Sequence, residues 1–245
     1  MEPAVVVQGL TYQYKSDGPL ILKNINFQVA QGEILAIMGL SGCGKSTLCS
    51  CLCGIIPHYW SGLMAGKVMV NGKNIQQFNL ANLALEVGMV FQNPDTQLFS
   101  STVEDEIAFA PENMCLAPDI IRERVDQVIS LLGITALREA KPNQLSGGEK
   151  HLVALAAVLA LDPPVLILDE VMSQLDSDGK KLVASAIKTL HTRGKTIVAV
   201  EHDLETVNFA DRLLVMNDGE IVRIDVTESL LADRDFLLAN RLAFA

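Results

Sequence analysis

The sequence has no long apolar run. Runs such as Val153 to Leu161 and Val165 to Leu168 are far shorter than the roughly 20 residues that a membrane-spanning helix needs. The first ten residues, MEPAVVVQGL, contain no basic segment followed by a long apolar stretch, so we do not expect a signal peptide. The sequence therefore predicts neither a spanning helix nor a secretion signal.

Basic residues are also few. The chain has 19 Lys and Arg against 29 Asp and Glu, a net charge of -10 and a pI near 4.8. An acidic surface repels phosphate backbones, which argues against nucleic acid as the main partner but leaves room for a local nucleotide pocket. With 49% hydrophobic residues among 245, the chain can bury a core as one large domain or two small ones.

The cysteines form a poor metal pattern. Their odd number, five, without a secretion signal points to reduced thiols. Cys49, Cys51 and Cys53 form C-x-C-x-C, but a zinc site would need a second Cys/His cluster. Small buried residues suit the helix expected there, so core packing is favoured over metal binding.

Short apolar or near-alternating runs predict strands, and Val68 to Val70 followed by Asn71-Gly72 predicts half of a hairpin. The other expected strands are Ala4 to Leu10, Leu20 to Val29, Glu33 to Met38, Glu86 to Phe91, Val165 to Leu168, Thr196 to Val200 and Arg212 to Met216. Helical periodicity in Ile120 to Leu132 and Gly147 to Leu161 predicts a helical block over about residues 93–160 between two groups of strands. The tail, Thr227 to Ala245, is expected to be helical.

Residues 39–47, GLSGCGKST, match the phosphate-loop pattern G-x-x-x-x-G-K-[ST] between an expected strand and an expected helix. Glycines let successive backbone N–H groups form an anion nest, and the helix adds the positive end of its dipole. Lys45 can reach the β- and γ-phosphates of ATP, and the Ser46 hydroxyl can ligate Mg²⁺. Thr47 occupies the place of the third glycine of a dinucleotide loop, which disfavours that alternative. The candidate ATP-binding residues of this loop are Gly39, Ser41, Gly42, Cys43, Gly44, Lys45, Ser46 and Thr47.

Two carboxylates follow the expected strand Val165 to Leu168. Strand ends at the carboxyl edge of an α/β sheet are where ligands bind, so Asp169 is the expected Mg²⁺ partner. Glu170 is then placed to act as the general base on the attacking water. The alternative, that the pair caps the next turn, is weaker beside the phosphate loop.

Residues 145–149, LSGGE, resemble the LSGGQ signature of ABC ATPases, and the resemblance covers roughly residues 4 to 224. It implies an α/β fold: a P-loop NTPase of the ABC ATPase type, with a mixed RecA-like core sheet, an antiparallel β subdomain and an inserted helical subdomain. Residues 1–245 would form a single ABC ATPase domain. In that family the signature of one subunit closes over ATP held by another, so Ser146, Gly147 and Gly148 would contact the nucleotide in trans.

The resemblance also assigns roles to single residues. Tyr14 would stack on adenine, although it could be a core aromatic and Tyr12 is the rival candidate. Gln92 would sense Mg²⁺ and the water, and His202 would contact the γ-phosphate. Ser173 to Asp176 matches the D-loop that crosses the dimer seam.

Two positions depart from the family pattern. Glu149 replaces the last Gln of the signature, and Leu152 lies where importers usually carry Arg. The γ-phosphate contacts come mainly from Ser146 and backbone N–H groups, so Glu149 can leave catalysis intact. The departures raise the alternative of a poorly hydrolysing regulatory partner in a heterodimer with two unequal ATP sites.

Residues 91–97, FQNPDTQ, and 102–113, TVEDEIAFAPEN, resemble the energy-coupling factor (ECF) ATPases, with Ala110 in place of the usual Gly. The resemblance implies ATP and Mg²⁺ as cofactors and a peripheral location on the cytoplasmic face of the cell membrane. It also implies a second ABC ATPase subunit, a transmembrane T component and a substrate-binding membrane S component as partners. The cargo would be a vitamin or a transition-metal ion. For Asp105 and Glu106 the alternative is that they favour a helix dipole.

Other interpretations remain open. A non-transport ABC protein that acts on DNA or ribosomes would carry a long coiled-coil insertion or a tandem cassette, and the sequence shows neither. A module that binds ATP without turnover is compatible with Glu149 and Leu152. A conventional ABC importer ATPase is the nearest alternative, and the sequence leaves homodimer and heterodimer open.

Overall fold

The computed structural model describes residues 2–173, 175–204 and 206–242. A six-stranded sheet has the order β10-β9-β3-β8-β7-β6, with β3 and β6 to β9 parallel and β10 antiparallel to β9. Its strands are β3 (Ile34–Gly39), β6 (Val87–Val90), β7 (Val165–Asp169), β8 (Thr196–Val200), β9 (Arg212–Asn217) and β10 (Glu220–Val226). A second, antiparallel sheet has the order β2-β1-β4-β5 and contains β1 (Val5–Gln13), β2 (Leu22–Val29), β4 (Leu63–Val70) and β5 (Lys73–Asn74).

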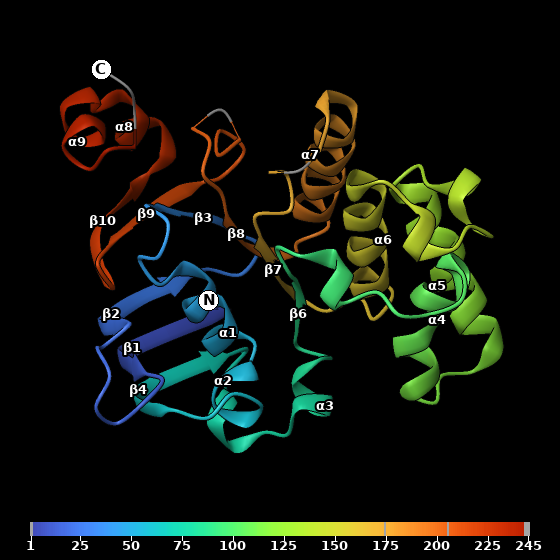
Figure 1. The fold of residues 1–245 in the computed structure, drawn as a ribbon, viewed down its shortest axis with the longest axis horizontal. Helices are drawn as coiled ribbons and strands as arrows, with labels where there is room; N and C mark the ends of the chain where they lie inside the picture. The colour runs from blue at the N-terminus through green and yellow to red at the C-terminus, as the bar shows by residue number, and fades with distance from the viewer. Residues whose placement is uncertain (1, 174, 205, 243–245) are drawn as a thin grey trace.

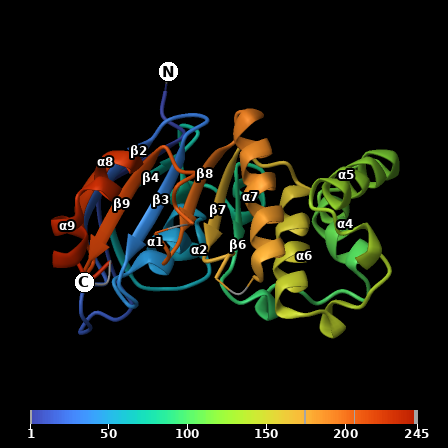
Figure 2. The ribbon, with the colours of Figure 1, turned by 90° about the horizontal axis from the view of Figure 1, so that it is seen from above.

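Helices cover the six-stranded sheet and fill the segment between β6 and β7. The helices are α1 (Lys45–Leu52), α2 (Ile55–His58), α3 (Leu80–Leu83), α4 (Val103–Asn113), α5 (Pro118–Leu131), α6 (Gly147–Leu159), α7 (Ser177–Thr192), α8 (Thr227–Ala232) and α9 (Arg234–Ala239). Single 3-10 turns occupy Ile75–Gln77, Pro94–Thr96, Thr135–Leu137 and Pro142–Gln144. Both views place α4 and α5 at one end of the molecule and α8 and α9 at the other (Figures 1 and 2).

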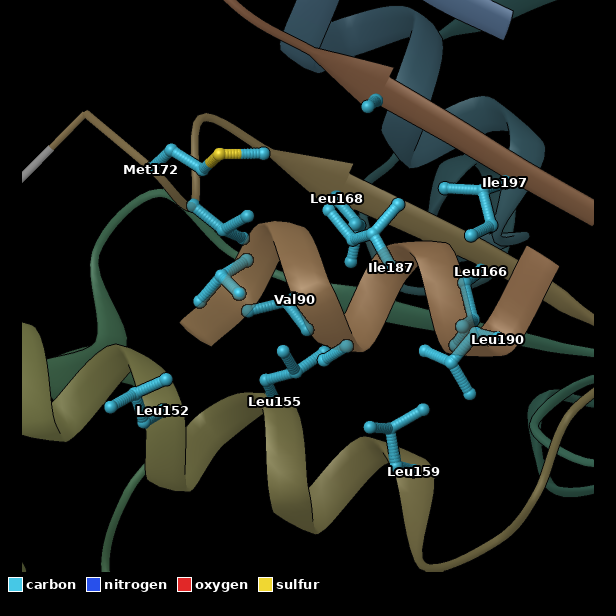
Figure 3. Close-up of a cluster of buried hydrophobic side chains, with 14 of the residues drawn as sticks. Val90, Leu152, Leu155, Leu159, Leu166, Leu168, Met172, Ile187, Leu190 and Ile197 are labelled. Atoms are coloured by element: carbon cyan, nitrogen blue, oxygen red, sulfur yellow. The ribbon is translucent and has the colours of Figure 1, made fainter. Parts of the chain in front are cut away.

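Two hydrophobic clusters lie on opposite faces of the six-stranded sheet. One joins the sheet to α4–α7, and Figure 3 shows its α6 and α7 part, where Ile187 lies beside Leu168 and Leu155 lies near Val90. The other joins the sheet to α1 and the antiparallel sheet. Because both faces are covered, every residue of β3, β7 and β8 is buried, which explains their continuous apolar runs.

The parallel register brings three strand ends to one edge. Val200 of β8 pairs with Asp169 of β7 and with Ile37 of β3, two residues before Gly39. The segments that follow these strands are the phosphate loop, Glu170 and His202. The carboxyl edge of the sheet therefore collects the candidate groups from three distant parts of the sequence.

Most predicted elements are present, with shifted ends. The strand expected over Glu86 to Phe91 is Val87–Val90, and the helix expected to reach Leu161 ends at Leu159. The tail is helical as expected, in two short helices, α8 and α9, separated by Asp233 in a non-helical conformation. Residues 243–245 lie outside the described residues. Sequence analysis missed β10 and α7.

Cys49, Cys51 and Cys53 are buried in the cluster beside α1, which confirms that they pack in the core. Burial raises the pKa of Cys51 to about 12, so its thiol is neutral at physiological pH. Among the described residues, no group of three or more His, Cys, Asp and Glu side chains could hold a metal ion. Within the same part of the chain, no helix has the length and apolar character needed to cross a membrane.

Glu201 directly follows β8 and is only 2% exposed. Its Oε1 has no hydrogen-bond partner in the described structure, and its Oε2 accepts a long hydrogen bond of 3.5 Å from the Thr206 hydroxyl. Burial, and then the nearby Glu170 carboxylate, raise the pKa of Glu201 from 4.5 to about 8. Between these two pH values the folded state binds the proton that the unfolded state has lost, so the free energy of unfolding falls as pH rises.

We predict that Glu201→Gln stabilises the chain and that the gain grows with pH. Because each pKa unit is about 1.4 kcal/mol, the gain in unfolding free energy is expected to be on the order of a few kcal/mol at pH 8.5 and near zero at pH 4.5. Urea denaturation at pH 4.5, 6.5 and 8.5 measures it. Glu220→Gln, an exposed carboxylate replaced in the same way, is the control. A gain that is equal at all three pH values would contradict the prediction.

Candidate functional site

A cavity of about 330 Å³ opens at the carboxyl edge of the six-stranded sheet. It is lined by Tyr14, Ile21, Ser41, Gly42, Gly44, Lys45, Ser46, Thr47, Gln92, Glu170 and His202. Ten of these eleven residues are candidates named from the sequence, and they come from the loops after β1, β3, β6, β7 and β8 and from the start of α1. Of the other candidates, Gly39, Cys43 and Asp169 belong to the loop and the strand end beside the cavity, whereas Ser146, Gly147 and Gly148 do not line it.

The phosphate loop wraps around the start of α1. Gly44 precedes the helix with a φ of 103°, and a Cβ there would lie 2.9 Å from the carbonyl oxygen of Ile21, so both conformation and space require glycine. Lys45 is 5% exposed, and its Nζ donates to the carbonyls of Gly39 at 2.8 Å and Leu40 at 3.1 Å. The ammonium group is thus held inside the loop, where an anion bound by the backbone N–H groups would meet it.

Cys43 contributes to this loop through its backbone. Its side chain is 5% exposed, and burial raises the pKa of the thiol. The Cys43 N–H donates to Leu40, and its carbonyl accepts from Gly219 in the turn between β9 and β10. These contacts fix the loop against the sheet.

Asp169 and Ser46 form an oxygen-rich corner at the end of β7. Asp169 is 3% exposed, and its Oδ1 has no hydrogen-bond partner among the described residues. Burial raises the pKa of Asp169, and the hydrogen bond from the Ser46 side chain opposes this shift. Carboxylate, hydroxyl and amide oxygens are ligands that suit Mg²⁺, so an orphaned carboxylate oxygen beside Ser46, which lines the same cavity as Gln92, fits that ion.

Glu170 is held by two side chains from opposite directions in the sequence. Gln92 Nε2 donates to its Oε2 at 2.6 Å, and His202 Nε2 pairs with its Oε1. The Glu170 backbone has a φ of 56°, which is costly for a residue with a long side chain, and its N–H donates to Val200 at 3.0 Å. A carboxylate that is 6% exposed and oriented in this way is arranged to accept a proton from a water molecule.

The geometry separates the two tyrosine candidates. Tyr12 is fully buried, and its hydroxyl donates to the Ser61 carbonyl at 3.1 Å, so it is a core aromatic. Tyr14 is 46% exposed, lines the cavity and packs edge-to-face on Tyr12 with ring centroids 4.9 Å apart. Its hydroxyl lies 3.1 Å from the Thr47 hydroxyl, so Tyr14 is the ring that a base could stack on.

The signature residues lie at the start of α6, away from the cavity. Ser146 caps the helix, and its Oγ accepts from the Glu149 N–H while the Glu149 carboxylate accepts from the Ser146 N–H at 2.8 Å. The same carboxylate accepts from the Ser146 hydroxyl at 2.7 Å, and these bonds lower the pKa of Glu149. The hydroxyl that the family resemblance assigns to the γ-phosphate is therefore bonded to a charged carboxylate in this chain.

The remaining predicted positions have structural contacts. Ser173 donates through its hydroxyl to the Glu170 carbonyl at 2.8 Å, and Asp176 caps α7 by accepting from Gly179 at 2.8 Å. Gln174 of the D-loop lies outside the described residues. Leu152 is 6% exposed and packs in the cluster of Figure 3, so the position where importers usually carry Arg is a core position here.

Sequence analysis missed two buried polar residues next to this site. Glu201 directly follows the buried strand β8 and precedes His202, and that charge after five apolar or β-branched residues was a usable signal. His151 is 1% exposed and bridges the carbonyls of Gly147 and Gln92. No spacing rule would have found the second contact, because it depends on the path of the loop after β6.

Comparison with known proteins identifies the family. Residues 22–173 match the family model described as ABC transporter. The chain is 43% identical over 228 residues to the energy-coupling factor transporter ATP-binding protein EcfA of Methanosarcina acetivorans, a match that covers 93% of this chain and 81% of that protein. A longer relative from the same organism is 40% identical over 89% of this chain, which spans 34% of that relative.

Solved structures agree with this assignment. CbiO1 of Clostridium perfringens, described as part of the ABC transporter complex CbiONQ, matches with a TM-score of 0.84 and 33% identity over 100% of this chain and 96% of that chain. The bacterial ABC cassette MJ0796, dimeric in a post-hydrolysis state with ADP and Pi, matches with a TM-score of 0.81 and 27% identity over 91% of this chain and 98% of that one.

These matches confirm the expected ABC ATPase fold and the resemblance to ATP-binding subunits of the energy-coupling factor type. ABC cassettes dimerise and work within multi-component transporters, as the described complexes illustrate. The chain belongs to the ABC transporter family and is an ATP-binding subunit whose ATP hydrolysis is coupled to transport.

Proposed function

We propose that this chain powers an ECF-type importer for a vitamin or a transition-metal ion, as a peripheral subunit on the cytoplasmic face of the cell membrane. Residues 1–245 would act as a single ABC ATPase domain, with about residues 93–160 as its helical subdomain. The relatives named EcfA and CbiO1 support the importer class. The observation that carries the proposal is an apolar groove formed by the segment that resembles the ECF ATPases.

This groove has a volume of about 230 Å³ and lies between the end of β6, α4 and α6. Phe99 and Phe109 flank it with ring centroids 4.6 Å apart, and they are 65% and 44% exposed. Its other lining residues include Met89, Ala110, Ala157, Val158 and Leu161. A groove with exposed aromatic rings and small apolar residues suits the apolar face of a helix, which here would be a coupling helix of the T component.

Glu106 keeps the groove in shape. It is 4% exposed, and its Oε2 accepts from the backbone N–H groups of Phe99 at 2.8 Å and Ser100 at 2.6 Å. Asp105, by contrast, lies in the first turn of α4 and fits the helix-dipole alternative. Because Glu106 fixes the loop that carries Phe99, the docking surface is formed before any partner arrives.

For hydrolysis we propose that Lys45 and the backbone of the phosphate loop hold the β- and γ-phosphates and that Tyr14 stacks on adenine. Ser46, Asp169 and Gln92 would hold Mg²⁺, which supplies charge neutralisation on the phosphates. Glu170 would accept the proton of the attacking water, and His202 would turn from Glu170 to the γ-phosphate. The bonds from Gln92 and His202 to Glu170 orient its carboxylate until the nucleotide enters.

Glu170→Gln is expected to lower kcat for ATP hydrolysis by about 100-fold or more while ATP still binds, because a Gln amide keeps the shape but cannot accept the proton. Phosphate release and fluorescent-ATP binding measure the two quantities. Lys45→Ala is the companion variant and should lose ATP binding itself. Turnover at the wild-type rate in Glu170→Gln would remove Glu170 as the base.

We further propose that two ATPase subunits enclose two ATP molecules, each between the phosphate loop of one chain and Ser146, Gly147 and Gly148 of the other. In this arrangement the Glu149 carboxylate approaches a triphosphate. Its bonds to Ser146 compete with the phosphate for the serine hydroxyl, and its charge repels the phosphate. A weakened closed state is what a regulatory, poorly hydrolysing subunit would need.

Glu149→Gln should strengthen ATP-dependent dimerisation about three- to tenfold at low salt. The Gln amide oxygen still accepts from the Ser146 N–H and preserves the helix cap, so only the charge is removed. Light scattering with ATP in the Glu170→Gln background measures dimer formation, and Glu139→Gln on the exposed α5–α6 connection controls for net charge. Equal dimerisation of both variants and the parent would contradict the repulsion.

The groove is tested with Phe109→Asp in cells that express the full chain. This substitution places a charge between Phe99 and Ala110, and a buried unpaired carboxylate is unfavourable in an apolar interface. It should therefore lower, by more than about tenfold, the amount of a multi-spanning membrane protein that is recovered with the chain from solubilised membranes. Leu63→Asp, at a 56% exposed position of β4, is the matched control and should keep the partner. Recovery of nucleic acid or ribosomes in place of a membrane protein would favour the non-transport alternative.

A further inference from the structure

His151 lies in the second turn of α6, directly after the signature, and is 1% exposed. Its Nδ1 lies 3.0 Å from the carbonyl oxygen of Gly147 in the same helix. Its Nε2 lies 3.0 Å from the carbonyl oxygen of Gln92 in the loop after β6. A single buried ring thus connects the start of the signature helix with the backbone of the proposed Mg²⁺-sensing residue.

The contact continues to the proposed catalytic carboxylate. The Gln92 side chain donates to Glu170 at 2.6 Å, and Glu170 also pairs with His202. Moving the Gln92 backbone would move its side chain and change the orientation of Glu170. A path of close polar contacts therefore runs from Gly147 through His151 and Gln92 to Glu170.

The ring has two discrete hydrogen-bonding arrangements. Both of its partners are carbonyl oxygens, which only accept, and an imidazole with one N–H can donate to only one of them. With the hydrogen on Nε2 the ring ties α6 to the loop at Gln92. With the hydrogen on Nδ1 it bonds only within its own helix, and the loop is released.

We propose that His151 is a positioning residue that couples the two ATP sites of the dimer. This inference rests on the proposed sandwich, in which the Gly147 end of α6 serves the nucleotide of the partner while Gln92 and Glu170 serve the chain's own nucleotide. Engagement of the signature then sets the Gln92 backbone through the ring. ATP bound at one site thereby aligns the base at the other.

Two substitutions separate the two ring nitrogens. The amide nitrogen of Gln reaches the position of Nε2, whereas that of Asn reaches only the position of Nδ1. His151→Gln is therefore expected to keep kcat within about twofold of wild type, and His151→Asn to lower it about five- to tenfold, the effect of one lost buried hydrogen bond. The Hill coefficient for ATP should exceed 1 in wild type and His151→Gln and fall toward 1 in His151→Asn.

A Gln92→Ala background tests whether His151 acts through Gln92. In that background the side chain that reaches Glu170 is absent. Adding His151→Asn to Gln92→Ala should therefore lower kcat by less than about twofold relative to Gln92→Ala alone. Lys150→Gln is the matched control. The ion pair between Lys150 and Asp95, at 2.6 Å, also joins α6 to the loop after β6, but Asp95 is largely exposed, so losing the pair should have little effect. This variant should leave kcat and the Hill coefficient within about twofold of wild type.

Equal kcat and equal Hill coefficients in the Gln and Asn variants would overturn the proposal. A full additional loss in the Gln92→Ala background would also overturn it, since it would show a role in packing alone. Failure of the sandwich itself is recognised separately. In that case Glu170→Gln shows no ATP-dependent dimer by light scattering, whatever residue occupies position 151.

Discussion

Three carboxylates are buried at the carboxyl edge of the parallel sheet, and the rest of the site is arranged around their charge. Among the described residues, Glu170 alone of the three has donors on both oxygens. Asp169 and Glu201 each keep an oxygen without a partner in that part of the chain, and burial raises the pKa of both. Such a cluster lowers stability, because desolvated charges without partners are unfavourable. Lys45 lies close enough to Asp169 to stabilise its charged form, and a bound cation would supply the partner that its orphaned oxygen lacks.

The position of these groups at one edge of the sheet also separates two functional regions of the chain, the phosphate-loop cavity and the signature at the start of α6. The phosphate loop and Glu170 share one cavity because parallel strands end at a common edge, whereas Ser146 begins α6 within the helical segment that connects β6 to β7. No signature residue lines that cavity in the described monomer. In the proposed sandwich the site is assembled from two chains, so a contact between the two ends of one chain, such as that of His151, bears on both nucleotides.

The elements that the sequence predicts well are those whose side chains all meet the same surroundings, such as a strand that is buried on both faces. Strand β7 is buried on both faces and is flanked by a proline pair and two carboxylates, so its apolar run gives both its position and the site at its end. Strand β10 was missed because it is an edge strand paired only with β9, in which Arg223 and Asp225 interrupt the apolar residues. The His151–Gln92 contact and the Ser146–Glu149 bonds depend on loop path and rotamer, which no local pattern encodes.

Leu152 and His151 together show how α6 is fixed. The helix is apolar on most of its buried surface, and Leu152 adds to that surface where importers usually place a cation. Apolar packing alone would allow the helix to slide or rotate slightly with little change in energy. A buried imidazole that carries its hydrogen on Nε2 restricts such displacements, because moving α6 away from the loop breaks the bond to the Gln92 carbonyl and leaves an unpaired group in a dry environment. Burying His151 thus lowers stability but sets a defined register between the signature helix and the loop that carries Gln92, the residue that donates to the proposed base Glu170.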